Sequence, residues 1–166
     1  MSKKKTIGLG LGILAIAIVV AAVVFFRIKP MLESENNPRI ISIVASVGEN
    51  GAVLDYYIPE EEISPQLDDS LLSLFSNAHI ERTLLPRPQS YEISDGSVYF
   101  TIHVSDGHSM LVNLSNISNY NSLQRGNTHY SIVAHEALYE DVSALLSDVL
   151  PDYVVTESAS DLPSSN

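Results

Sequence analysis

Histidine side chains are the residues of this chain whose type and placement best suit chemistry. Three of them, His103, His129 and His135, lie in stretches that alternate between apolar and polar residues. In such a stretch, the polar residues project from the face of a β-strand that the apolar ones avoid. If strands 98–104 and 128–136 are neighbours, the three imidazoles cluster on the outer face of a sheet, where they could bind Zn²⁺. The competing interpretation is a half-exposed polar face that tolerates histidine, and it is favoured because no fixed ligand spacing accompanies the histidines.

Other motifs of catalysis and metal binding are incomplete. His135-Glu136 begins the H-E-x-x-H motif of zinc proteases, but position 139 is tyrosine. The acidic residues at 60–62 and 68–69 lack the alternating ligands and the glycine of a calcium loop. No serine occupies a G-x-S-x-G elbow, and the chain has no phosphate-binding loop. The sequence therefore predicts a protein that is not an enzyme and has no cofactor.

The first elements that would position these residues form a hairpin. Residues 39–47 and 52–58 alternate in polarity and flank the two-residue turn Asn50-Gly51. This turn predicts a register in which every inward pair is apolar. The pairs are Val47 with Leu54, Ala45 with Tyr56 and Ile43 with Ile58.

Two later segments have helical periodicity. Residues 65–77 carry an apolar face, with Ser64 as the N-cap and Pro65 at the first helical position. Residues 138–150 carry a second apolar stripe, which ends before Pro151.

Two Asp-Gly turns predict further antiparallel pairs. The turn at 95–96 is expected to pair Ile93 with Val98. The turn at 106–107 is expected to lie in a three-residue loop, because a two-residue loop would break the apolar face. The predicted pairs across this loop are Phe100 with Val112 and Ile102 with Met110. With a last strand at 128–136, the element order β-β-α-β-β-β-β-α predicts an α+β fold with an antiparallel sheet and two helices on one face.

An apolar run of 21 residues, 6–26, precedes these elements and contains neither charge nor proline. Such a run is about long enough to cross a hydrocarbon core. It ends in bulky and basic residues without an A-x-A site, so an uncleaved signal anchor is expected, and a cleaved signal peptide is the alternative. Gly8 and Gly12 have the spacing at which membrane helices pack closely, which makes a homodimer possible, although this spacing is common by chance.

Charged residues are unevenly distributed along the chain. Beyond residue 30 there are four arginines and twenty carboxylates, which gives a net charge of −16. This charge excludes nucleic-acid binding and disfavours anionic lipid. The lysines at 3–5 favour an N-terminus inside the cytoplasm and a C-terminal part outside it. The chain has no cysteine, which excludes disulfides and a lipoprotein anchor.

These observations predict five parts in the chain. They are a cytoplasmic tail at 1–5, a transmembrane signal anchor at 6–26, a linker at 27–38, an extracytoplasmic α+β domain at 39–152 and a disordered tail at 153–166.

Residues 97–146 run strand, turn, strand and loop, followed by Ile132-Val133-x-x-Glu136-x-Leu138-Tyr139 before a helix. This plan resembles the uncharacterised small membrane-tethered extracytoplasmic domains of Gram-positive bacteria, and the resemblance transfers no active site. We expect a single-pass protein of the cell membrane whose outer domain binds another protein or an envelope component as a non-catalytic sensor or accessory module. The alternative is a metal- or ligand-binding envelope protein that uses the histidine-bearing sheet face.

Overall fold

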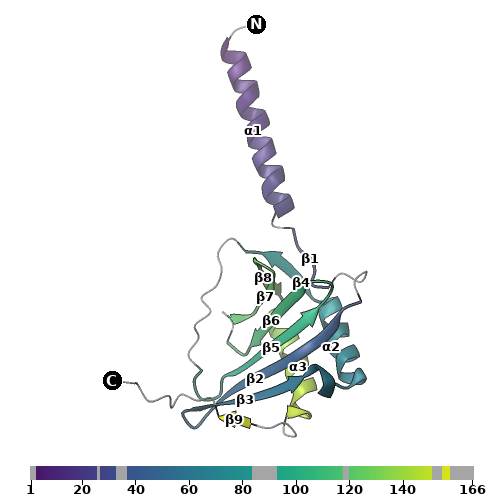
Figure 1. Cartoon of the computed structure of the whole chain (residues 1–166). Coiled ribbons are helices and arrows are strands. Elements are labelled where there is room, and N and C mark those ends of the chain that lie inside the picture. The colour runs from purple at the N-terminus through teal and green to yellow at the C-terminus, as the bar shows by residue number, and fades with distance from the viewer. Residues whose placement is uncertain are drawn as a thin grey trace, which may run out of the picture.

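The computed structural model describes residues 3–25, 27–32, 37–83, 93–117, 120–150 and 155–157. It is an α+β fold in which one long helix projects from a domain built on an antiparallel sheet (Figure 1). In chain order, the elements are α1 (Lys3–Phe25), β1 (Lys29–Pro30), β2 (Arg39–Glu49), β3 (Ala52–Pro59), the 3₁₀ helix η2 (Glu60–Glu62), α2 (Pro65–Asn77), β4 (His79–Arg82), β5 (Val98–Ser105), β6 (Ser109–Ser115), β7 (Ser122–Arg125), β8 (Thr128–Val133), α3 (His135–Ser147) and β9 (Val155–Glu157).

The described strands form one sheet of nine strands in the order β1-β4-β8-β7-β6-β5-β2-β3-β9. Every neighbouring pair is antiparallel. The predicted α+β class and antiparallel sheet are therefore confirmed. The predicted element order lacks four of these strands, namely β1, β4, β7 and β9.

The β2–β3 hairpin has the register that its turn predicts. Val47 pairs with Leu54, Ala45 with Tyr56 and Ile43 with Ile58. Both turn residues have positive φ, 52° at Asn50 and 76° at Gly51, as a type I′ turn requires.

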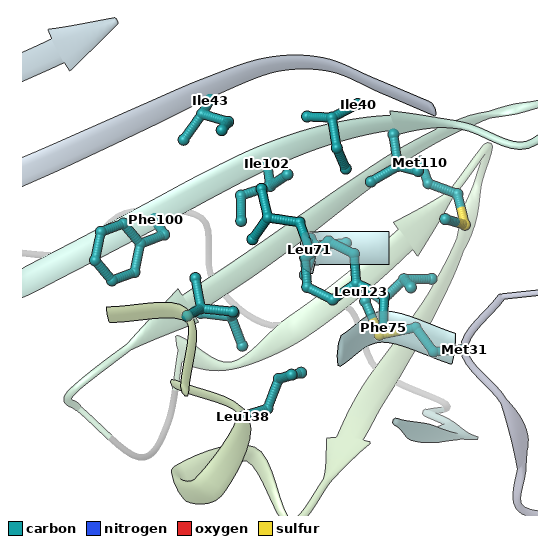
Figure 2. Close-up of a cluster of buried hydrophobic side chains, with 14 of the residues drawn as sticks. Met31, Ile40, Ile43, Leu71, Phe75, Phe100, Ile102, Met110, Leu123 and Leu138 are labelled. Carbon is teal, nitrogen blue, oxygen red and sulfur yellow. The ribbon is translucent and has the colours of Figure 1, made fainter. Parts of the chain in front are cut away.

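The packing of α2 and α3 against one face of the sheet creates the core. Leu71 and Phe75 of α2 and Leu138 of α3 point toward strand residues such as Ile102 (Figure 2). Helix α2 has its predicted bounds, and the Oγ of Ser64 accepts a hydrogen bond from the backbone N–H of Leu67 at 3.2 Å. This cap supplies one of the acceptors that the first turn of a helix lacks.

Helix α3 begins at His135, three residues before the predicted start, and strand β8 ends at Val133 rather than at residue 136. Ala134 lies between them with a φ of 53°, in the left-handed region. This conformation ends the strand and turns the chain directly into the helix.

The predicted pairing of Ile93 with Val98 is wrong. Val98 pairs with Val47 of β2 instead, and Ile93 and Ser94 lie outside any strand, while residues 91 and 92 are not among the described residues. The turn at 95–96 instead docks on the end of β2, where the N–H of Gly96 donates to the carbonyl of Gly48 at 2.9 Å. Gly48 permits this approach, because a Cβ there would collide with the Ser94 carbonyl.

The loop between β5 and β6 has the predicted length of three residues, but it comprises 106–108 rather than 105–107; Gly107 has a φ of 83°. The predicted register across it is wrong by two residues, because Ser105 and Ser109 close the loop as a pair. The core face of both strands is nevertheless the predicted one, since a shift of two preserves side-chain direction. The observed pairs are Phe100 with Leu114, Ile102 with Val112 and Val104 with Met110.

The predicted apolar N-terminal helix is present as α1, whose side chains are described from residue 14 onward. Figure 1 shows it clear of the sheet, at the end of the domain where β1 and β4 lie. Among the residues whose side chains the structure describes, which in α1 begin at residue 14, no helix meets the length and apolarity needed to cross a membrane. The face at Gly8 and Gly12 lies outside the described side chains, so the homodimer stays a prediction.

Part of the predicted disordered tail is ordered. Residues 155–157 form β9 and pair with Leu54–Tyr56 of β3, while the rest of 153–166 lies outside the described residues. The edge of β3 offers unpaired backbone groups, and a passing segment can satisfy them whatever its side chains are.

Candidate functional site

Two of the three predicted histidines lie in one row across the outer face of the sheet. The row runs from His103 on β5 through Leu111 on β6 and Gln124 on β7 to His129 on β8. The condition for a histidine cluster, that β5 and β8 are neighbours, is not met, because β6 and β7 separate them. Three strand spacings place the two backbones about 14 Å apart, which is too far for one metal ion.

The third histidine is not on a strand. His135 is the first residue of α3, and its Nε2 atom is buried without a hydrogen-bond partner among the described residues. Across the described part of the chain, no three His, Asp or Glu side chains gather as a metal would require. The geometry does not bring the predicted metal ligands together.

The row of His103 and His129 belongs to a wider surface, which we name the open face. Its residues alternate with the buried ones on five adjacent strands, and all are half-buried. They are Ser42, Val44, Thr101, His103, Leu111, Asn113, Ser122, Gln124, His129 and Ser131.

The open face carries hydrogen-bonding groups without formal charge when its histidines are neutral. At its centre, Thr101 and Asn113 face each other across β5 and β6, with the Thr101 Oγ1 donating to the Asn113 Oδ1 at 3.1 Å. Toward the loop at 106–108, the Nε2 of His103 lies 2.8 Å from the Oγ of Ser109. Next to Val44, the Tyr57 side chain on β3 is 53% exposed.

A second feature lies where α1 meets the domain, and we name it the juxtahelix groove. It is an open groove of about 1050 Å³ between the C-terminal half of α1 and the edge formed by β1, β4 and β8. Phe25 and three cations, Arg27, Lys29 and Arg82, line it together with Tyr130. The Arg82 guanidinium lies 4.2 Å from the centre of the Phe25 ring, and the Lys29 ammonium lies 4.6 Å from the centre of the Tyr130 ring.

A third feature is an acidic hollow between α2 and α3. It has a volume of about 670 Å³ and is lined by Asp69, Asp141 and Asp148 together with small and apolar residues. Its carboxylates do not converge on a metal position among the described residues. They are the solvated outer faces of two amphipathic helices.

No family model, no curated protein and no solved structure matches this chain. We therefore infer its role from geometry and charge.

Sequence reasoning identified the outer position of His103 and His129 but missed both larger features. The width of the open face depends on β7, and the juxtahelix groove depends on β1 and β4, none of which the sequence predicted. The one sequence feature that could have indicated the groove is the placement of its positive charges. Lys29 and Arg82 are two of the few cations in a strongly acidic chain.

Proposed function

We propose that this chain is a single-pass membrane protein whose α+β domain lies outside the cytoplasm and binds a partner protein of the envelope without catalysis. The lysines at 3–5 support this orientation. Tethering concentrates the domain at the membrane surface, so weak contacts suffice for binding.

Helix α1 is the observation that carries the proposal. It is 23 residues long, and the twenty that follow its three lysines span roughly 30 Å at 1.5 Å per residue, which matches a hydrocarbon core of ~30 Å. Of its described side chains, the large apolar ones from Leu14 to Val24 are each between 56% and 69% exposed. A helical segment that is apolar on all sides and mostly exposed is stable in lipid and costly to hydrate.

The open face supports the partner-binding half of the proposal. Beyond residue 30 the chain has a net charge of −16, yet the ten residues of this face carry no formal charge, and Glu81, the partner of Ser131 on β4, lies at its border. Depletion of charge and nearby tyrosine are features of the centres of protein interfaces. The polar groups are spread over five strands rather than gathered in a cleft, which suits binding better than catalysis.

A photo-crosslinking residue placed on the full chain in its native membrane tests this assignment. We expect a residue at Thr101, at the centre of the open face, to form an adduct with an envelope or membrane protein. Ser73, exposed on α2 and away from that face, provides the matched position and is expected to give none. Adding Val44→Arg should abolish the Thr101 adduct, because it introduces an unpaired charge into the interface.

Equal adducts from Thr101 and Ser73 would contradict a specific face. Adducts formed only with a second copy of the chain would replace the partner by self-association. The thermal unfolding midpoint of the Val44→Arg variant must match that of the wild type, so that loss of the adduct reports on the surface and not on folding.

A further inference from the structure

We propose that the juxtahelix groove binds the headgroup of an anionic phospholipid from the membrane that α1 enters, and that this contact orients the domain. The inference rests on the proposed membrane anchoring. It assigns a lipid class to a groove whose parts lie on three strands and one helix.

The groove has two chemically different halves. One half is formed by α1 side chains between Ile16 and Val24, which are aliphatic. The other half is formed by Arg27, Lys29 and Arg82, and no carboxylate is among the described residues that line it. An acyl chain matches the first half, and an anionic headgroup matches the second.

The fold places Lys29 and Arg82 next to the C-terminal end of α1. Lys29 pairs with Ile80 in β1–β4, and Arg82 pairs with Tyr130 in β4–β8, so the sheet edge brings both cations to the end of α1. If α1 spans the membrane, this end lies at the level of the headgroups. Described carboxylates line a different hollow, the one between α2 and α3.

Aromatic contacts hold the cations in place. Arg82 stacks on Phe25, and the Lys29 Nζ donates to the Tyr130 Oη at 3.4 Å in addition to lying over its ring. Among the residues that the structure describes, no carboxylate forms an ion pair with either cation, so both can contact an anion in the groove. A phosphate bound there would gain charge-assisted hydrogen bonds from both side chains.

This proposal differs from the expectation that the acidic part of the chain disfavours anionic lipid. Net charge acts over the whole surface, but its effect is screened within about 10 Å at 0.1 M salt. A local cluster of cations at the membrane therefore decides the interaction with headgroups.

The test titrates the full chain, held in a neutral detergent, with phosphatidylglycerol or with phosphatidylcholine, and measures bound lipid by native mass spectrometry. The wild type should bind phosphatidylglycerol more tightly than phosphatidylcholine. The double variant Lys29→Gln/Arg82→Gln should bind phosphatidylglycerol about 25-fold more weakly, because each cation near an anionic surface contributes about fivefold. Its affinity for phosphatidylcholine should fall much less, because the choline cation already offsets the phosphate charge of that lipid.

Two further variants serve as controls for a general loss of charge and for poor folding. Arg39→Gln removes an exposed cation that pairs with Glu60 at 2.8 Å on another part of the domain, and it should leave lipid affinity unchanged. Arg27→Gln alters an exposed residue of the groove and should weaken phosphatidylglycerol binding about fivefold even if the double variant folds poorly.

The proposal is overturned if the groove variants keep the wild-type preference for phosphatidylglycerol. It is also overturned if inorganic phosphate displaces the lipid at a concentration similar to that of the lipid, because the groove then binds free phosphate rather than a lipid headgroup. Insertion of the same chain into phosphatidylcholine vesicles, scored by resistance to alkaline extraction, separates the two proposals. A chain that inserts but shows no lipid preference refutes only the groove, and a chain that does not insert refutes the membrane anchor.

Discussion

At the scale of single residues, one ion pair between half-buried Arg125 and buried Asp106 ties the segment after β1 to the sheet. The Arg125 Nη2 lies 2.7 Å from the Asp106 Oδ2, and the Asp106 side chain is 1% exposed. The same nitrogen donates to the backbone carbonyl of Met31 at 3.1 Å, a residue 94 positions away in the chain. The pair therefore fixes the β5–β6 loop, strand β7 and the segment that follows α1 relative to one another.

Asp106→Ala should lower the free energy of unfolding by about 3 kcal/mol, because it leaves the Arg125 guanidinium buried without its counter-charge. Chemical denaturation of the full chain in detergent measures this change. Glu60→Ala is the matched control, since the Arg39–Glu60 pair has a similar length, 2.8 Å, but side chains that are 62% and 45% exposed. Its removal should cost less than about 1 kcal/mol. Equal losses in the two variants would refute the role assigned to burial.

The sequence identified many core residues but placed some wrongly, for a physical reason. Strict alternation along residues 39–47 would place Ile41 on the same face as Ile43, whereas a bulge between Ile40 and Ser42 brings Ile40 into the core at 2% exposure. A bulge inserts one residue and reverses the alternation beyond it. Nothing in a run of consecutive β-branched residues marks where that reversal occurs.

At the scale of elements, local signals were reliable where the chain supplies its own turn or cap. The β2–β3 register and the bounds of α2 followed from Asn50-Gly51 and from Ser64-Pro65. Strands β4 and β7 gave no such signal. Each is four residues long and buries a single side chain, Ile80 or Leu123, so their pairing depends on neighbours distant in sequence.

Sheet order accounts for the failure of the predicted histidine cluster. Alternation places His103 and His129 on the open face, as expected, but it carries no information on which strands are adjacent. The insertion of β6 and β7 between β5 and β8 is a property of the whole sheet.

The junction between β8 and α3 provides a test of backbone strain. Ala134 has a φ of 53°, and an L-residue in this region costs roughly 1–2 kcal/mol. Ala134→Gly should therefore raise the free energy of unfolding by about 0.5–1 kcal/mol, after the larger entropy of glycine in the unfolded chain is subtracted.

Ala144→Gly is the matched change in the interior of α3, where the residue is exposed. It should lower the free energy of unfolding by about 1 kcal/mol, because the helical conformation favours alanine. Opposite signs in the two variants, measured by denaturant titration, would confirm that Ala134 is strained. Destabilisation by both would show that its conformation carries no cost.

At the scale of the whole molecule, our proposal gives each of three surfaces a different binding role. The exposed apolar helix α1 enters the membrane, the juxtahelix groove at its end contacts headgroups, and the open face of the sheet receives a partner. The groove and the open face lie on different parts of the same sheet, so a headgroup bound at the β1–β4 edge would set how the open face is presented.

Membrane topology is the central claim, and the absence of cysteine makes it directly measurable. Single cysteines at Ser2 and at Glu61, an exposed residue of η2, would be the only thiols in the full chain. A membrane-impermeant maleimide added to intact cells should label the Glu61→Cys variant at once and the Ser2→Cys variant only after permeabilisation. Both variants should remain in the membrane after alkaline extraction. A cleaved signal peptide would instead remove the Ser2 thiol from the mature chain. Protection of Glu61→Cys in intact cells, or release of the uncleaved chain by alkali, would contradict an anchored extracytoplasmic domain.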